Sequence, residues 1–167
     1  MGQILKMKPE KTNAARILDT AKINYELVAY DVDENDLSAV HVAAQLHEPV
    51  GKVFKTLVLL GDKTGYLVCI IPGAEELDLK KAAKISGNKS CELIPMKELL
   101  PVTGYIRGAC SPVGMKKAFK TYIHESCLNF EEIYVSAGKR GLQILVNPLH
   151  IINLTSATVG FLIIVDN

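Results

Sequence analysis

The spacing of apolar residues in the first part of the chain predicts a helix, a strand and a second helix. After Thr12, whose side chain can cap a helix, apolar positions recur every three or four residues, the period of a helix with one buried face. Residues 25–30, YELVAY, alternate as a strand does. A second helix is predicted from a cap at Asp36 or Ser38 through His47.

Two aliphatic, β-branched runs at 53–60 and 66–71 predict a β-hairpin. They are separated by GDKTG, a loop bounded by glycine. Both runs are apolar at nearly every position rather than at every second one, so we expect both faces to be buried. This hairpin should anchor the sheet.

The second half of the chain mixes short helices and strands. The predicted elements are a helix at 79–86 between Asp78 and Gly87, a brief helix at 96–100, an irregular loop at 103–114, strands at 121–124, 132–136 and 142–146, a helix opening at Pro148 and an apolar tail at 159–165. Because strands and helices do not alternate strictly, we predict an α/β fold in the mixed α+β sense, with helices packed around a mixed sheet. At 167 residues one domain is expected, spanning 11–167, with residues 1–10 as a loose leader.

Composition excludes several classes of protein. Hydrophobic residues make up 49% of the chain and charged residues 22%, as in ordinary globular domains. A formal net charge of +1 rules out a uniformly basic, nucleic-acid-coating surface. Bases do gather at 80–89, at 107–120 and at Lys139–Arg140, either as solvated faces or as local contacts for RNA phosphates. No apolar run reaches the ~18 residues of a membrane span and no signal peptide is recognised, so we expect a cytoplasmic protein that does not contact membranes.

Cysteine and histidine spacing argues against a metal site or a disulfide framework. The four cysteines form no CxxC pair, and the four histidines form no HExxH. The motifs GxxxxGK[ST] and GxGxxG, which bind phosphates of nucleotides, are also missing. We therefore expect neither a metal nor a cofactor.

Lys55 is the most unusual residue of the predicted hairpin. By the two-residue period of a strand it shares a face with Val53, Leu57 and Leu59. Either its ammonium reaches solvent from the strand end, or it lines a pocket where it holds an oxygen-rich ligand. In a pocket, burial would lower its pKa.

Two glycine-containing segments follow or precede predicted strands. Gly138, Lys139, Arg140 and Gly141 form a loop in which backbone amides could approach a ligand while bases stand beside it. Gly108, in TGYIRGACSPVG, could likewise let the backbone approach a ligand. In both places the alternative is a tight surface turn.

Four sequence blocks in order resemble the YbaK/EbsC family, the cysteinyl-tRNA(Pro) deacylases. The blocks are FKTLVL at 54–59, LDLKKAAKISG at 77–87, TGYIRGACSPVG at 103–114 and YVSAGKRGLQI at 134–144. The resemblance covers roughly residues 10–160. It implies a mostly antiparallel, partly barrel-like sheet, similar to the editing domain of bacterial prolyl-tRNA synthetases.

The resemblance also implies a function and a set of site residues. The expected activity is hydrolysis of the ester of mischarged Cys-tRNA(Pro), with tRNA(Pro) and prolyl-tRNA synthetase as partners. The route that the resemblance implies is substrate-assisted: the cysteinyl thiol attacks its own carbonyl. Lys55 matches the family's essential lysine, and the substrate-binding positions implied are Tyr30, Phe54, Thr56, Gly108, Ser136, Gly138, Lys139, Arg140 and Gly141.

The sequence departs from the family pattern in the last block. Gln143 stands where some members carry Asp, and Ala137 replaces a frequent glycine. These differences bear on amino-acid selectivity. Two alternatives therefore stay open: an editing enzyme for another small amino acid such as alanine, and a non-catalytic module of the same fold that binds aminoacyl or nucleotide ligands beside a synthetase.

Overall fold

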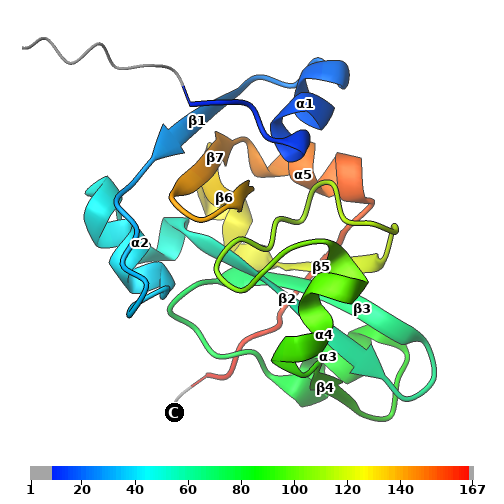
Figure 1. The fold of residues 1–167 in the computed structure, drawn as a ribbon. Helices are drawn as coiled ribbons and strands as arrows, with labels where there is room; N and C mark the ends of the chain where they lie inside the picture. The colour runs from blue at the N-terminus through cyan, green and yellow to red at the C-terminus, as the bar shows by residue number, and fades with distance from the viewer. Residues whose placement is uncertain (1–8, 166–167) are drawn as a thin grey trace, which may run out of the picture.

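The strands form two sheets with helices around them, as the computed structural model in Figure 1 shows. The structure describes residues 9–165, so nearly all of the predicted leader, residues 1–10, lies outside the described residues. One sheet has the order β1 (Tyr25–Ala29), β7 (Leu142–Val146), β6 (Ile133–Lys139). The other has the order β4 (Cys91–Leu93), β2 (Phe54–Gly61), β3 (Gly65–Pro72), β5 (Lys120–His124), β8 (Thr158–Gly160).

The helices lie between these strands in the chain. They are α1 (Asn13–Thr20), α2 (Ala39–Leu46), α3 (Leu79–Ser86), α4 (Met96–Thr103) and α5 (Pro148–Thr155), with short 3₁₀ turns η1 (Val50–Lys52) and η2 (Glu125–Asn129). The N-caps predicted at Thr12 and Asp78 are confirmed, since each side chain accepts a hydrogen bond from a backbone N–H of the first turn. Of the two candidates for α2, Ser38 is the cap.

The mixed α/β class is confirmed, with two sheets in place of one. Pairing is antiparallel within β1–β7–β6 and β4–β2–β3 and parallel for β3–β5 and β5–β8, so antiparallel pairs predominate as expected. A parallel bridge between Val53 and Tyr134 links the two sheets. The barrel-like arrangement stays open in the part of the chain that the structure describes, because the short strands β4 and β8 end the larger sheet instead of closing it.

Two hydrophobic cores lie on opposite faces of the larger sheet. One fills the space between the sheets, where Phe54, Val58 and Ile70 pack with residues of β6 and β7 such as Val135 and Ile144. The other lies under α3 and contains Leu59, Cys69, Ile71, Ala82 and Leu162. Alternate residues of β2 therefore enter different surroundings, which explains why the strand is apolar on both faces.

One edge of β2 is left open along its first half. Strand β4 pairs only with Leu59–Gly61, and the N–H of Ile94 then donates to the carbonyl oxygen of Val58 at 3.1 Å. On this side no described strand pairs with residues 54–57 of β2. An open strand edge presents backbone N–H and C=O groups to whatever lies beside it.

Candidate active site

A cavity of about 400 Å³ lies against the open edge of β2. This volume is within the usual range for small-molecule sites. Its walls come from segments distant in sequence: Tyr30; Leu37, Ser38, Ala39 and Val42 at the start of α2; Val53 with residues 54–58 of β2; Gly73 after β3; Leu93, Ile94, Met96 and Leu99 around α4; Arg107, Gly108 and Cys110 of the next loop; and Ser136 with Gln143 from the smaller sheet. The fold thus gathers short pieces of most of the chain around one strand edge.

Six of the ten predicted site residues line this cavity, namely Tyr30, Phe54, Lys55, Thr56, Gly108 and Ser136. The other four, Gly138, Lys139, Arg140 and Gly141, are outside its wall. They lie at the end of β6 and in the turn to β7, behind the loop that carries Gly108. Two of them contact residues of the cavity wall: Arg140 donates to the carbonyl oxygen of Arg107, and the carbonyl oxygen of Gly141 accepts from the N–H of Tyr30 at 2.9 Å.

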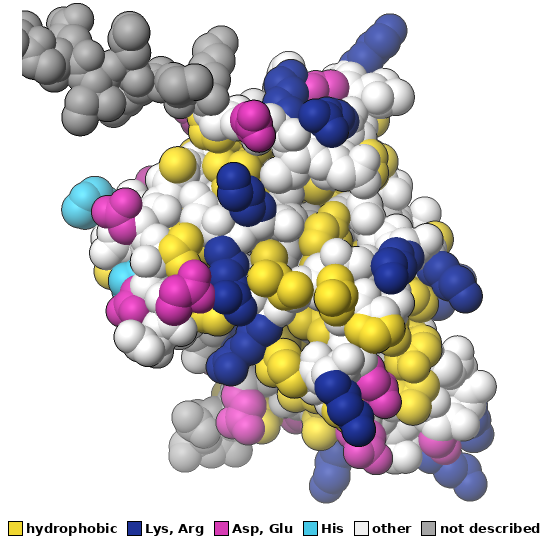
Figure 2. Space-filling view, in the orientation of Figure 1, with side chains coloured by type: hydrophobic (Ala, Val, Ile, Leu, Met, Phe, Trp, Pro, Cys, Tyr) yellow, Lys and Arg dark blue, Asp and Glu magenta, His cyan; other side chains and the backbone are white. Residues whose placement is uncertain are grey.

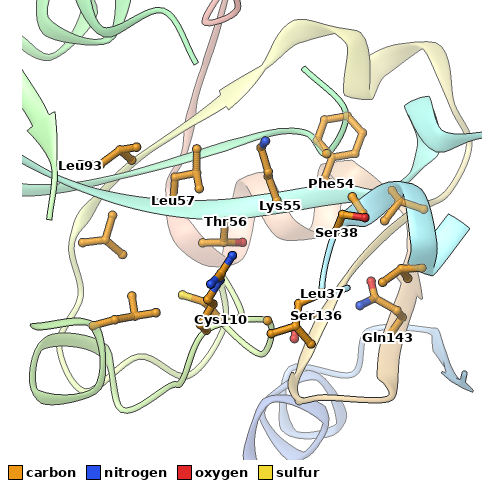
Figure 3. A pocket seen from close by; sticks show the side chains of 18 of the residues that line it. Leu37, Ser38, Phe54, Lys55, Thr56, Leu57, Leu93, Cys110, Ser136 and Gln143 are labelled. Carbon is orange, nitrogen blue, oxygen red and sulfur yellow. The ribbon is translucent and has the colours of Figure 1, made fainter. Parts of the chain in front are cut away.

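The cavity wraps around the strand edge, because Lys55 and Thr56 both line it from opposite faces of β2. Figure 3 shows the Lys55 amine and Leu57 projecting from one face, and Thr56 projecting from the other, toward Ser136 and Gln143. A ligand that touches both Lys55 and Thr56 must therefore cross the open backbone edge between them.

Lys55 is a partly buried cation without an ion pair to any described carboxylate. Burial lowers the pKa of its amine, and the carboxylates of Glu75 and Glu76 oppose this effect without cancelling it. An amine that has lost water and lacks a close partner gains from an oxygen-rich ligand.

Two buried polar atoms in the cavity wall have no hydrogen-bond partner among the described residues: Thr56 Oγ1 and Gln143 Oε1. Thr56 is 8% exposed and Gln143 is 5% exposed. Leaving such atoms unpaired costs roughly 1–3 kcal/mol each, so a ligand that pairs with them recovers this energy. By contrast, Ser136 Oγ is already occupied, since it donates to the carbonyl oxygen of Ala109 at 2.9 Å and accepts from the N–H of Gly138 at 3.1 Å.

The Gly108 loop is fixed from behind by Arg140. Arg140 Nε donates to the carbonyl oxygen of Arg107 at 2.9 Å, and its Nη1 pairs with Glu34 at 2.6 Å. Gly108 has φ +82°, and an added Cβ would lie 3.3 Å from Leu37 Cδ1 and 3.4 Å from Arg140 Nε. Glycine is thus required both for the backbone conformation and for the space.

Sequence reasoning missed several cavity residues, among them Leu37, Ser38, Arg107, Cys110 and Met96. Gln143 was noted only as a departure from a family pattern. For the polar residues Ser38 and Arg107, the only available signal in the sequence was their position in loops next to predicted elements. Burial raises the pKa of the Cys110 thiol to about 12, which keeps it protonated near neutral pH and unsuited to act as a nucleophile.

Among residues 9–165, no group of three or more His, Cys, Asp and Glu side chains is arranged to hold a metal ion. Nor does this part of the chain contain a helix long and apolar enough to cross a membrane.

Comparison with known proteins identifies the family. The profile of the aminoacyl-tRNA editing domain matches residues 33–154, so the chain belongs to this family. The chain is 50% identical over 151 residues to EbsC of Enterococcus faecalis, named as a Cys-tRNA(Pro)/Cys-tRNA(Cys) deacylase; the match covers 90% of this chain and 92% of that protein.

Two further likenesses agree with this assignment. A proline–tRNA ligase of Thermosipho africanus is 33% identical over 76 residues, which is 46% of this chain and 13% of the ligase. A crystal structure described as a trans-editing enzyme for prolyl-tRNA synthetase has a TM-score of 0.80 and 25% identity, covering 93% of this chain and all of that one (100%).

Proposed function

We propose that the protein is a trans-editing deacylase that hydrolyses the ester of cysteinyl-tRNA(Pro). The supporting observation is that one cavity combines a partly buried lysine with two unpartnered polar atoms, in a chain 50% identical to a protein named for this activity. An aminoacyl ester is an activated acyl group, so its cleavage needs positioning and charge stabilisation more than a strong protein nucleophile.

The geometry suggests how the substrate would lie. The aminoacyl group crosses the open edge of β2, where backbone groups can hold the carbonyl. Lys55 on one face stabilises negative charge that develops on oxygen, and Thr56 and Gln143 on the other face bind the polar atoms of the amino acid. This arrangement would use the two faces of one strand at a single site.

The substrate's own thiol supplies the nucleophile in this proposal. Its sulfur bonds to the carbonyl carbon, the bond from that carbon to the ribose oxygen breaks, and the thiol proton goes to the ribose oxygen. The products are free tRNA and a cysteine thiolactone, which water then opens to cysteine. Because the thiol of Cys110 stays protonated, the enzyme offers no competing thiolate of its own in the cavity wall.

Assays with the wild-type protein on tRNA(Pro) charged with cysteine, serine, alanine or proline test this function. We expect release of cysteine to be at least tenfold faster than release of serine, since a thiol is the better nucleophile. Equal rates for serine and cysteine would indicate an activated water instead. Preferential release of alanine would assign the enzyme to a different amino acid. If none of the four amino acids is released, the protein is a non-catalytic binding module.

The partner and location follow from the same substrate. We infer that the protein works on tRNA(Pro) released by prolyl-tRNA synthetase, and therefore in the cytoplasm. Co-sedimentation of purified protein with prolyl-tRNA synthetase, with and without tRNA(Pro), tests whether the synthetase itself is bound.

A further inference from the structure

A second cavity, of about 560 Å³, lies between α1, the start of β5 and the end of α5. No described residue lines both this cavity and the candidate active site. The loop between α4 and β5 contributes to both, since Cys110 lines the first and Pro112 the second. The apolar side chains of the second cavity are Ile17, Pro112, Val113, Met115, Phe119 and Leu154. Its size and apolar walls are those of a site for a small molecule.

Hydrogen bonds within the chain fix the loop that forms one wall of the second cavity. The carbonyl oxygen of Val113 accepts from the hydroxyl of Tyr105, and the N–H of Val113 donates to Ser111 Oγ at 3.2 Å. The N–H of Lys116 donates to the carbonyl oxygen of Thr103 at 3.1 Å. Because these bonds satisfy backbone groups that no helix or strand pairs, the loop keeps its shape and the cavity is formed without a ligand.

Two lysines, Lys117 and Lys120, line the second cavity, and no Asp or Glu of the described chain does. Both lysines are exposed, and neither forms an ion pair with a described carboxylate. The ammonium of the adjacent Lys116 is engaged elsewhere, since it donates to the carbonyl oxygen of Pro101 at 3.4 Å. Figure 2 shows basic side chains, with no acidic one beside them, on the side of the molecule where the loop between α4 and β5 runs in Figure 1. A negatively charged group at this cavity therefore meets two cations and no opposing carboxylate.

We propose that the second cavity binds a small amphipathic carboxylate, with its apolar body against the apolar wall and its head group at Lys117 and Lys120. An apolar body gains free energy by leaving water for the apolar wall. The C-terminal end of α5 also lies at this cavity, through Leu154, Thr155 and Ser156. Because the carbonyl end of a helix is its negative pole, a singly charged carboxylate suits the cavity better than a doubly charged phosphate does.

Calorimetric titration of the wild-type protein with four probes, each below its micelle-forming concentration, tests this chemistry. Decanoate carries both the apolar body and the carboxylate, decanol lacks the charge, acetate lacks the body, and decyltrimethylammonium reverses the charge. We expect a one-to-one complex with decanoate, a dissociation constant about tenfold lower than for decanol, and no measurable binding of acetate. Equal affinity for decanoate and decyltrimethylammonium would overturn the proposal, because the lysines would then play no part.

Variants locate the bound probe. In the double variant Lys117→Ser, Lys120→Ser, decanoate should bind only as weakly as decanol binds the wild type. The matched control Lys63→Ser, Lys89→Ser makes the same change in net charge at two exposed lysines that line neither cavity, and it should bind decanoate like the wild type. Lys55→Met, which removes the lysine of the candidate active site, should also bind normally. Undiminished binding in the double variant, or loss of binding in Lys55→Met, would place the ligand elsewhere and overturn the proposal.

Two further measurements do not depend on catalysis, so they hold whether or not the proposed function is correct. Decanoate should raise the Tm of the wild type and of Lys55→Met, and leave the Tm of the double variant unchanged, because only a ligand that binds the folded state stabilises it. Uncharged tRNA(Pro) should leave decanoate bound, whereas complete displacement would assign the two lysines to nucleic acid and contradict the proposal. Single variants Lys117→Ser and Lys120→Ser replace the double variant if it fails to fold.

Discussion

Arg140 Nε and the carbonyl oxygen of Arg107 form a 2.9 Å hydrogen bond that joins two segments 33 residues apart. The same guanidinium pairs with Glu34, so one side chain ties the β6–β7 turn to the loop before α2 and to the cavity loop. Arg140 is outside the cavity wall, and we infer that it acts on the site by positioning Gly108.

Arg140→Lys should reduce kcat/KM about tenfold with little loss of stability. Lysine keeps the charge but lacks the planar fork that reaches both partners. Because the ion pair with Glu34 is solvent-exposed, its loss should cost less than ~1 kcal/mol. Glu34→Gln is the matched control, since it removes only the ion pair and should leave the kinetics near wild type. Equal effects of the two variants would mean that the contact with Arg107 is unimportant.

Gly108→Ala should lower both stability and activity. A non-glycine residue at φ +82° costs about 1–2 kcal/mol, and its Cβ also approaches Leu37 and Arg140 closely. Gly87→Ala is the control, because Gly87 has φ +79° but nothing within 4 Å of an added Cβ. Urea unfolding should give a stability loss of ~1 kcal/mol or more for Gly87→Ala and a larger loss for Gly108→Ala, with activity lost only for Gly108→Ala. Full activity of a folded Gly108→Ala protein would remove this loop from the site.

Thr56→Val should stabilise the protein while reducing its activity. The substitution keeps the shape of the side chain and removes a buried hydroxyl without a partner among the described residues, which is worth roughly 1 kcal/mol. Thr103→Val is the control and should destabilise the protein, because Thr103 Oγ1 donates to the carbonyl oxygen of Leu99 at 2.7 Å. Thermal unfolding and single-turnover deacylation measure the two effects. A Thr56→Val enzyme with wild-type kinetics would show that this hydroxyl does not contact the substrate.

The pH dependence of activity should follow the amine of Lys55. Burial lowers its pKa from 10.5, and if the charged form is required, kcat/KM should fall as pH rises through that lowered value. Stability should change in the opposite direction. Between the folded and the unfolded pKa the unfolded state binds more protons, so the free energy of unfolding rises with pH in this window. Both slopes should disappear in Lys55→Met, and a persistent activity slope would assign the titration to another group.

Sequence periodicity predicted the local structure better than the arrangement of the sheets. The caps at Thr12 and Asp78 act within one turn, so their chemistry is readable from neighbouring residues. Strand β4 was missed because three residues are too few to display a period. The division into two sheets depends on pairings such as Tyr25 with Val146, which join residues far apart in the chain.

Individual residues of the candidate site could be named from the sequence, but the shape of the cavity that they line could not. Alternation along β2 singled out Lys55 among its apolar neighbours, and six of the ten predicted residues line one cavity. Which face of the strand meets the other sheet is decided by tertiary packing, so the sequence did not reveal that Lys55 and Thr56 approach the cavity from opposite sides. For the same reason the supporting position of Arg140 was not foreseen.

The most direct test of this account is single-turnover hydrolysis of cysteinyl-tRNA(Pro) by Lys55→Ala. The matched control is Lys63→Ala, which removes an exposed lysine from the turn of the same hairpin, outside the cavity wall. With both variants folded, we expect Lys55→Ala to lose roughly 100 to 1000-fold in rate, the typical effect of removing a preorganised charge-stabilising donor, and Lys63→Ala to stay near wild type. A Lys55→Ala protein that hydrolyses the substrate at close to the wild-type rate would contradict the central claim.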